Sequence, residues 1–351
     1  MRVFVTGGSG FVGAHVLRVF ASHGAELLAP RHAEVDVTDA RAVRDSVVTF
    51  APDMVVHCAI LNDLAAMYAD RRAGWDAYVG ATRNLVEAAN EAGARMLLVS
   101  TDWVFDGTQS GATEVTPPNP INLYGFLKAA SELVVTERAE RGSVARIAAV
   151  QGSAGGGALP REHDLAALPR EHDPAALPRE QDAAALPREQ DAGFGYFVAA
   201  LVQRLRNEER FGVWESERIN MVATPTLASE AAELMWRILE RDLDGIFHCC
   251  GGESVDRRTL AMRAAQVFEL DPTLLDLGAA PPPEAFPLAS ASPTGSARAA
   301  ARSAPAAAGS APAAIPYDTS LDATHTAALL DVELPDVTEM LRRMCRELTP
   351  V

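Results

Sequence analysis

The chain has 351 residues, and its 47 acidic residues outnumber its 31 Lys and Arg residues, which gives a formal net charge of −16. A chain this acidic is not expected to bind nucleic acid, because phosphate backbones normally require a basic face. The sequence shows no signal peptide and no apolar run long enough to cross a membrane, so we expect a cytoplasmic protein without membrane contact. The four cysteines, Cys58, Cys249, Cys250 and Cys345, lack the spacing of a metal site.

The N-terminus predicts a strand, a turn and a helix. An apolar run, M-R-V-F-V-T, precedes Gly7, Gly10 and Gly13, and the helical segment A-H-V-L-R-V-F-A-S-H-G follows them. A second apolar strand, E-L-L-A-P, completes a βαβ frame. Glycines let the backbone approach a pyrophosphate, and the helix N-terminus offers unpaired N–H groups and a positive dipole end. The pattern therefore predicts a dinucleotide-binding site.

The residues after the second strand bear on which dinucleotide is bound. An acidic residue at the strand end binds the ribose 2′-hydroxyl, whereas a cation accommodates a 2′-phosphate. Here the strand ends at Pro30-Arg31, and the nearest acids, Glu34 and Asp36, come later. This order favours NADP(H). NAD(H) stays the alternative, since Arg31 could equally be a solvated surface arginine.

Strands and helices continue to alternate along the chain. M-V-V-H-C-A and R-M-L-L-V-S-T-D are typical of apolar strands, and N-L-V-E-A-A-N-E-A between them is typical of a helix. Continuous apolar strands separated by helices predict an α/β fold, with a doubly wound parallel sheet covered on both faces. Ligands of such sheets bind outside the carboxyl ends of the strands, where Ser100, Thr101 and Asp102 fall.

Lys128 is the only lysine in the chain, and it follows Tyr124 by four residues in N-L-Y-G-F-L-K. Residues i and i+4 of a helix share a face, so the ammonium is expected to lie beside the phenol. A planar guanidinium would be a poor substitute for a point charge in that position. Thr101, Tyr124 and Lys128 could thus meet over the cofactor, and coincidental spacing is the alternative.

The motifs resemble those of the extended short-chain dehydrogenases, most closely the dTDP-4-dehydrorhamnose reductase family of sugar-nucleotide-binding proteins. The similarity rests on T-G-G-S-G-F-V-G, D-V-T-D, S-T-D-W-V-F-D-G and Y-G-F-L-K, which occur in this order between residues 6 and 128. The resemblance implies a Rossmann-type sheet with a smaller C-terminal substrate-binding lobe. It also implies that NADPH reduces a keto group on a nucleotide-linked deoxysugar.

The resemblance assigns roles to the matching residues. Tyr124 would give a proton to the forming alkoxide, Lys128 would lower the pKa of Tyr124 and reach the nicotinamide ribose, and Thr101 would donate a hydrogen bond to the substrate oxygen. Asp102 and Trp103 would contact the substrate, with packing as the alternative for Trp103. Besides Tyr124 and Lys128, the cofactor contacts would be Gly7, Gly10, Phe11, Val12, Gly13, Arg31, Asp36, Val37, Cys58 and Ala59.

Several positions depart from the family pattern. Tyr78 stands where these proteins usually carry a proton-relay Asn, and Ala149 and Gln151 stand where the reductases often carry Trp and Tyr. Trp103 replaces a glutamate of the related 4,6-dehydratases, which disfavours a dehydratase. The alternatives left open are a nucleotide-sugar epimerase and a catalytically silent, NADP-binding regulatory subunit.

Two stretches interrupt the fold pattern. A nine-residue unit with a helix-breaking proline occurs four times between Ala158 and Gly193 and is too short to bury a core. A second stretch, rich in Ala, Pro and Ser, predicts a flexible linker. We therefore expect a Rossmann domain at 1–152, a disordered repeat insert at 153–193, a substrate-binding lobe at 194–278 and 315–351, and a flexible insert at 279–314. Homodimerisation is an expectation from the family alone.

Overall fold

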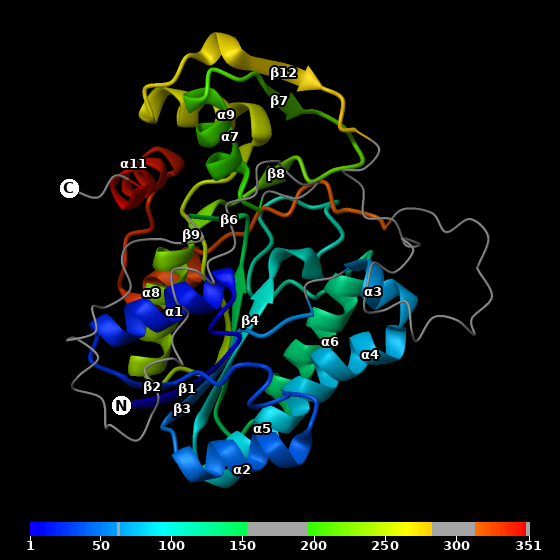
Figure 1. The fold of residues 1–351 in the computed structure, drawn as a ribbon, viewed down its shortest axis with the longest axis vertical. Coiled ribbons are helices and arrows are strands. Elements are labelled where there is room, and N and C mark those ends of the chain that lie inside the picture. Colours follow the sequence, from blue (N-terminus) through cyan, green and yellow to red (C-terminus); the bar gives the residue numbers. More distant parts are fainter. Residues whose placement is uncertain (62–63, 153–194, 283–312, 349–351) are drawn as a thin grey trace.

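The computed structural model describes residues 1–61, 64–152, 195–282 and 313–348, and the predicted repeat insert lies outside them. Figure 1 shows the arrangement of the elements. The strands are β1 (Arg2–Thr6), β2 (Glu26–Leu28), β3 (Met54–His57), β4 (Arg95–Thr101), β5 (Gly142–Ile147), β6 (Val150–Gln151), β7 (Phe211–Trp214), β8 (Val222–Ala223), β9 (Thr226–Leu227), β10 (Gly245–His248), β11 (Val255–Asp256) and β12 (Leu275–Ala279). The helices are α1 (Phe11–Ser22), α2 (Ala40–Phe50), α3 (Leu64–Ala69), α4 (Arg71–Trp75), α5 (Ala81–Ala92), α6 (Leu123–Arg138), α7 (Phe197–Arg206), α8 (Ala228–Glu240), α9 (Arg257–Val267), α10 (Thr324–Leu330) and α11 (Val337–Leu348), with a π-helix η1 (Asp76–Gly80) and 3-10 helices η2 (Asp102–Val104) and η5 (Pro272–Leu274).

A six-stranded parallel sheet forms the centre of the molecule, in the order β10-β5-β4-β3-β1-β2. Every residue of β3 and β4 is buried, which explains why these strands are continuous apolar runs rather than alternating ones. The predicted α/β doubly wound fold is confirmed. Because β2 and β3 lie on opposite sides of β1, the strand order reverses at the β1–β3 pair, and such reversals are where open α/β sheets bind ligands.

Helices cover both faces of this sheet (Figure 1). α1 and α8 pack together on one face, and α2, α5 and α6 form the layer on the other. The edge strand β10 of this sheet and the helix α8 come from beyond residue 152. The sheet layers thus draw on the chain that follows the predicted Rossmann range, and the proposed domain bounds stay a prediction.

A smaller lobe lies at the top of Figure 1, where α7, α9, β7 and β12 lie together, with α11 beside them. β7 and β12 pair in parallel, and α9 packs against both α7 and α11. Their apolar faces share one core, in which Phe197, Leu260 and Met340 are fully buried. None of the helices in the described ranges is long and apolar enough to span a membrane.

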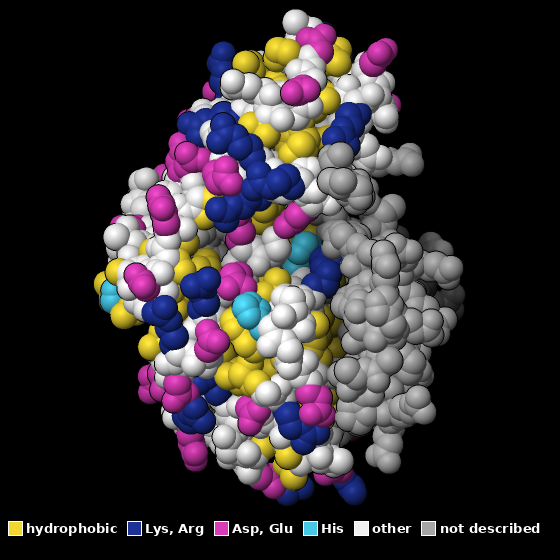
Figure 2. Space-filling view, turned by 90° about the vertical axis from the view of Figure 1, so that its left-hand side faces the viewer, with side chains coloured by type: hydrophobic (Ala, Val, Ile, Leu, Met, Phe, Trp, Pro, Cys, Tyr) yellow, Lys and Arg dark blue, Asp and Glu magenta, His cyan; other side chains and the backbone are white. Residues whose placement is uncertain are grey.

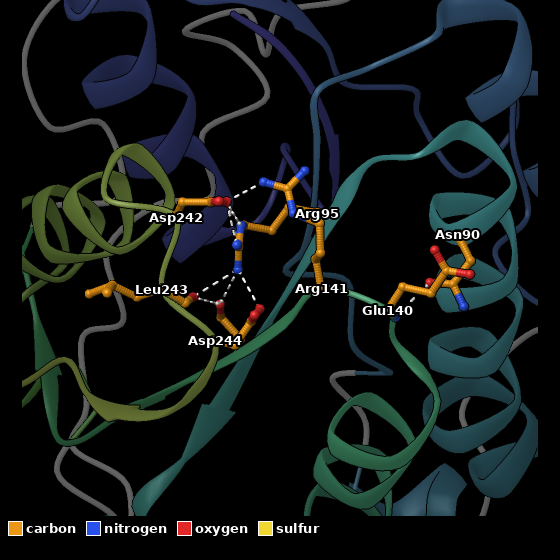
Figure 3. A network of polar contacts seen from close by, with 8 residues as sticks. Asn90, Arg95, Glu140, Arg141, Asp242, Leu243 and Asp244 are labelled. Atoms are coloured by element: carbon orange, nitrogen blue, oxygen red, sulfur yellow. Dashed lines mark hydrogen bonds and ion pairs between the residues drawn. The ribbon is translucent and has the colours of Figure 1, made fainter.

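Polar contacts centred on Arg95 connect the first residue of β4 to the turn between α8 and β10 (Figure 3). The side chain of Arg95 is only 1% exposed, and its guanidinium donates to the Leu243 carbonyl at 2.8 Å and to the Asp244 carboxylate at 2.6 Å. Asp242 accepts from both Arg95 and Arg141. These contacts hold the α8–β10 turn against the amino ends of β4 and β5, opposite the edge where ligands of such sheets bind.

We expect Arg95→Met to lower the free energy of unfolding by about 1 to 3 kcal/mol, because the substitution removes the buried guanidinium together with its charge-assisted hydrogen bonds. Arg138→Met is the matched control, since Arg138 pairs with Glu87 at the surface with both side chains about half exposed. This control should change stability by less than about 0.5 kcal/mol. Urea unfolding of both variants measures the difference, and equal effects would contradict a structural role for the Arg95 contacts.

Candidate active site

The glycine turn after β1 lies against the end of β3. Gly7 has a φ of +71°, and a Cβ there would come within 2.5 Å of the Ala59 amide nitrogen. A Cβ on Gly13 would lie 2.1 Å from the Gly7 carbonyl oxygen. Close backbone packing thus requires glycine at both positions. The two glycines form a cradle for a ligand at the point where the strand order reverses. The first turn of α1 contains no acidic residue, so its positive end is free for an anion.

The segment after β2 carries the residues that the sequence connects with the cofactor ribose. Asn84 on α5 donates to the carbonyls of Val37 and Thr38 at 3.0 and 3.3 Å, which fixes this loop to the helix layer. Asp36 accepts from the backbone and hydroxyl of Thr38, and the backbone hydrogen bond lowers the pKa of its carboxyl. Arg31 is exposed and lies in the loop three residues after β2, which ends at Leu28. The structure thus places Arg31 and Asp36 on one short loop near the switch point.

The Lys128 ammonium is buried, with its side chain only 4% exposed. Its Nζ donates to the Val99 carbonyl at 2.8 Å and lies 5.6 Å from the centre of the Tyr78 ring. Burial lowers the pKa of Lys128 to about 8, and the neighbouring Cys58 and Glu132 act against this shift. Tyr78, at the position where the family suggests Asn, therefore presents an aromatic face to the cation. Its own hydroxyl donates to the Leu61 carbonyl at 3.1 Å.

Tyr124 is on the first turn of α6. Asn122 caps the start of this helix, because its side chain accepts a hydrogen bond from the Gly125 amide at 2.8 Å. The Tyr124 ring meets Tyr78 and Trp103 edge to face, with centroids 6.1 and 6.0 Å away. Burial raises the pKa of Tyr124 to about 12, and a hydrogen bond with Thr101 acts in the opposite direction. The phenol thus stays protonated at neutral pH, as a proton donor must.

The expectation that Lys128 lowers the pKa of Tyr124 is not met in this structure. The ammonium is turned toward the Val99 carbonyl and the Tyr78 ring, and the groups that act on the Tyr124 phenol are Thr101 and Asp102. The two residues share a helix face as the spacing predicted. Their side chains, however, make their polar contacts with different partners.

Asp102 directly follows Thr101, the last residue of β4, and its side chain is buried. One carboxylate oxygen lies 2.9 Å from the Thr101 hydroxyl, and the other accepts from the Thr319 hydroxyl at 2.5 Å. Burial raises the pKa of Asp102 to about 6, against the hydrogen bonds from Thr319 and Thr101. Both oxygens thus have partners inside the protein. Direct contact of Asp102 with a substrate stays a prediction, and so does that of Trp103, which packs against Ile219 and its apolar neighbours.

A buried ion pair lies one helical turn beyond Lys128. Glu132 accepts from Arg146 through both oxygens, at 3.0 and 2.7 Å, and from the Ser100 hydroxyl at 2.5 Å. Both charged side chains are at most 4% exposed. The third guanidinium nitrogen of Arg146, Nη1, has no hydrogen-bond partner among the described residues, and the guanidinium lies 5.1 Å from the Phe105 ring centre.

His57 and Cys58 bring two neutral groups to the same edge. The His57 ring nitrogen Nδ1 is 2.7 Å from the Thr6 hydroxyl, and burial lowers the pKa of His57 to about 3. Burial likewise raises the pKa of the Cys58 thiol to about 12, with Lys128 acting against it. Both side chains are therefore uncharged at neutral pH, and Lys128 is the charged group that acts on both of them.

The structure adds partners that the sequence analysis missed. Glu132 follows Lys128 by four residues, so the helical spacing that connects Tyr124 to Lys128 could also have found it. Arg146 and Thr319 gave no comparable signal, since they reach the site from β5 and from the C-terminal segment. Gln151, at the Tyr position of the resemblance, accepts from the Val198 amide at 3.0 Å and so holds the start of α7. Ala149 has a left-handed φ of +43° and packs against the core of the smaller lobe.

The sheet, the glycine turn and the Thr101, Tyr124 and Lys128 cluster define a Rossmann-type protein of the short-chain dehydrogenase class. Residues 1–181 match the family described as RmlD substrate binding domain, and the chain belongs to this family. The resemblance to dTDP-4-dehydrorhamnose reductases is thereby confirmed.

Individual relatives show how far the similarity extends. The chain is 33% identical to methionine adenosyltransferase 2 subunit beta of Rattus norvegicus over 158 residues, which is 43% of this chain and 47% of that protein. It is 31% identical to a dTDP-4-dehydrorhamnose reductase of Streptomyces griseus over 156 residues, 44% of this chain and 51% of that protein. The aligned part of the chain thus spans about half the length of these curated relatives.

A solved structure extends the similarity of the fold to nearly the whole chain. The dTDP-4-dehydrorhamnose reductase of Bacillus anthracis str. Ames, in complex with NADP, superposes with a TM-score of 0.70 at 18% identity, over 98% of this chain and 96% of that one. At this identity the similarity establishes the fold, including the smaller lobe.

We expect Glu132→Gln to lower the free energy of unfolding by about 3 kcal/mol or more, because it leaves the Arg146 charge uncompensated in the interior. Glu87→Gln, which changes one partner of a half-exposed pair, should have an effect below about 0.5 kcal/mol. Urea unfolding measures both. Glu132→Leu should be destabilised in the same way, and adding Arg146→Met to Glu132→Leu should recover much of the stability that Glu132→Leu alone loses. An equal loss in this single variant and in the double variant would argue against a charge effect.

Proposed function

We propose that this chain is an NADPH-dependent reductase of a keto group on a nucleotide-linked deoxysugar, similar to a dTDP-4-dehydrorhamnose reductase. The observation that carries the proposal is that a protonated Tyr124 forms a hydrogen bond with Thr101 at the end of β4, while the buried Lys128 ammonium lies on the same helix. Membership of the RmlD family and the similarity to the Streptomyces griseus reductase support it. A cytoplasmic location and a homodimer stay predictions.

The site fits a nicotinamide dinucleotide. Gly7 and Gly13 let the backbone of the turn pack closely at the positive end of α1, where a pyrophosphate would bind. Arg31 would pair with a 2′-phosphate, which favours NADPH over NADH. Lys128 would hold the nicotinamide ribose. When bound, the cofactor supplies the hydride, and the protein contributes orientation and proton transfer.

The side chains of the site would carry out the proton chemistry. Tyr124 would donate its phenolic proton to the oxygen that becomes an alkoxide as the carbonyl is reduced. Thr101 would donate a hydrogen bond to the same oxygen, an interaction that strengthens as negative charge develops. Lys128 would act by holding the cofactor, since its ammonium faces the Val99 carbonyl and the Tyr78 ring rather than the Tyr124 phenol.

A regulatory, catalytically silent NADP-binding subunit is a second candidate. The similarity to methionine adenosyltransferase 2 subunit beta favours it, since that relative is a subunit by name. Tyr78 and Ala149, at the positions that depart from the reductase pattern, support the same reading. An epimerase that keeps its cofactor oxidised is a further alternative, and it would show no net consumption of NADPH.

The experiment that tests the proposal is oxidation of NADPH by the purified full chain, supplied with dTDP-4-keto-6-deoxyglucose alone and with a 3,5-epimerase. We expect turnover that falls by about 10²-fold or more in Tyr124→Phe, because the proton donor is lost. Tyr317→Phe, which changes a side chain that is 43% exposed, is the control and should keep wild-type activity. Tight NADPH binding without turnover on a panel of keto-sugars would favour the silent subunit instead.

We expect Gly13→Ala to weaken NADPH binding at least about tenfold, or 1.4 kcal/mol, because the new methyl group displaces the Gly7 carbonyl and closes the cradle. Gly80→Ala is the control, since a Cβ at this helical position meets its neighbours at an ordinary 3.8 Å. Fluorescence titration with NADPH compares the two variants. Equal affinities would place the cofactor elsewhere.

A further inference from the structure

The Thr101 hydroxyl has three hydrogen-bond neighbours in the described part of the chain, which is as many as it can serve, so a keto oxygen of the substrate would be one too many. A hydroxyl offers one proton and two lone pairs. One lone pair of Thr101 accepts from the Trp103 amide at 3.2 Å, while Asp102 lies 2.9 Å away and the Tyr124 phenol is a further neighbour. Which of these groups takes the single proton of Thr101 depends on whether Asp102 can donate.

Thr319 fixes the orientation of the Asp102 carboxyl. Its hydroxyl donates to Oδ2 of Asp102 at 2.5 Å, and its own oxygen accepts from the Asn220 amide at 3.1 Å. Asn220 in turn donates to the Pro316 carbonyl at 3.0 Å. Oδ2 is therefore committed as an acceptor, and a proton on the carboxyl would have to sit on Oδ1, facing Thr101.

We propose that Asp102 is a positioning residue that sets the direction of the Thr101 hydroxyl and thereby switches the proposed reductase on and off. In the acid form, Asp102 donates to Thr101, whose proton is then directed at the keto oxygen. With both lone pairs of Thr101 occupied, Tyr124 must also direct its proton to the substrate. In the carboxylate form, Asp102 accepts the hydrogen bond of the Thr101 hydroxyl. The Tyr124 phenol can then donate its hydrogen bond to Thr101 instead of to the substrate. The inference rests on the proposed reductase function.

The switch would operate near physiological pH. Asp102 is 5% exposed, and its burial raises the pKa of the carboxyl to about 6. The titratable groups that face it are the Tyr124 phenol on α6 and the Cys250 thiol after β10. Burial raises the pKa of both, so they stay neutral across this range. Since the acid form is the competent one, activity should be high below about pH 6 and lost as the pH rises.

The pH dependence of kcat in wild type and Asp102→Asn tests this proposal, with NADPH and the keto-sugar at saturation. We expect wild-type kcat to fall at least about tenfold between pH 6 and pH 8. In Asp102→Asn, the amide donates to Thr101 at every pH while its carbonyl accepts from Thr319, so the profile should be flat over this range. Asp106→Asn, which changes a carboxylate bound to Thr108, is the control and should keep the wild-type profile. Parallel profiles in wild type and Asp102→Asn would overturn the proposal.

A second variant guards against misfolding of the first. Thr319→Val removes a hydrogen bond that lowers the pKa of Asp102, so the fall in kcat should move to higher pH. A purely structural role of Thr319 would lower kcat without moving the midpoint, and that result would count against the switch.

Infrared difference spectroscopy separates failure of this inference from failure of the reductase proposal, because it needs no turnover. Subtracting the spectrum of Asp102→Asn from that of wild type isolates the carbonyl band of the protonated Asp102 carboxyl. A band that disappears around pH 6 supports the switch even if no keto-sugar is reduced. A carboxylate that is already ionised at pH 5 overturns it, whatever the enzyme turns over.

Discussion

Burial of a single ammonium group is the constraint on which the site depends. Lys128 has one carbonyl partner and an aromatic face in place of water. Such a charge is costly in the interior unless other charges and dipoles compensate for its lost hydration. Glu132 supplies a negative charge one turn away, and Arg146 holds that carboxylate through two hydrogen bonds. The residues of β4, β5 and α6 at this edge therefore depend on one another for the stability of the buried charges.

This interdependence explains how the surroundings of Lys128 can accommodate Tyr78 at the Asn position of the family pattern. An asparagine would offer Lys128 a polar partner, whereas the tyrosine ring offers a face with negative electrostatic potential and excludes water. The π-helix η1, which contains Tyr78, turns the ring toward α6. The change thus removes a polar group near Lys128 while still stabilising its charge.

The sequence alone predicts the parts of this arrangement that are encoded locally. The βαβ frame, the buried strands and the shared helix face of Tyr124 and Lys128 all follow from hydrophobic periodicity and glycine placement. The partners of these residues do not. Arg146 is found only when β5 is placed beside β4, and Thr319 is separated from Asp102 by 217 positions in the chain. Likewise, the helical pattern of 228–240 identifies a helix but not that it packs on α1.

The segment 317–321, which precedes α10, connects these non-local parts. Its residue Asp318 bridges to Val222 of β8, Thr319 donates to Asp102, and Leu321 bridges to Ala112 in the loop that leads to α6. Gly107 in the same loop has a φ of +80°, and a Cβ there would lie 2.4 Å from the Tyr317 amide nitrogen. The segment therefore lies between β8 and the loop that connects β4 to α6. Any displacement of this segment would change the hydrogen bonds of the Asp102 carboxyl, and through them the direction of the Thr101 hydroxyl.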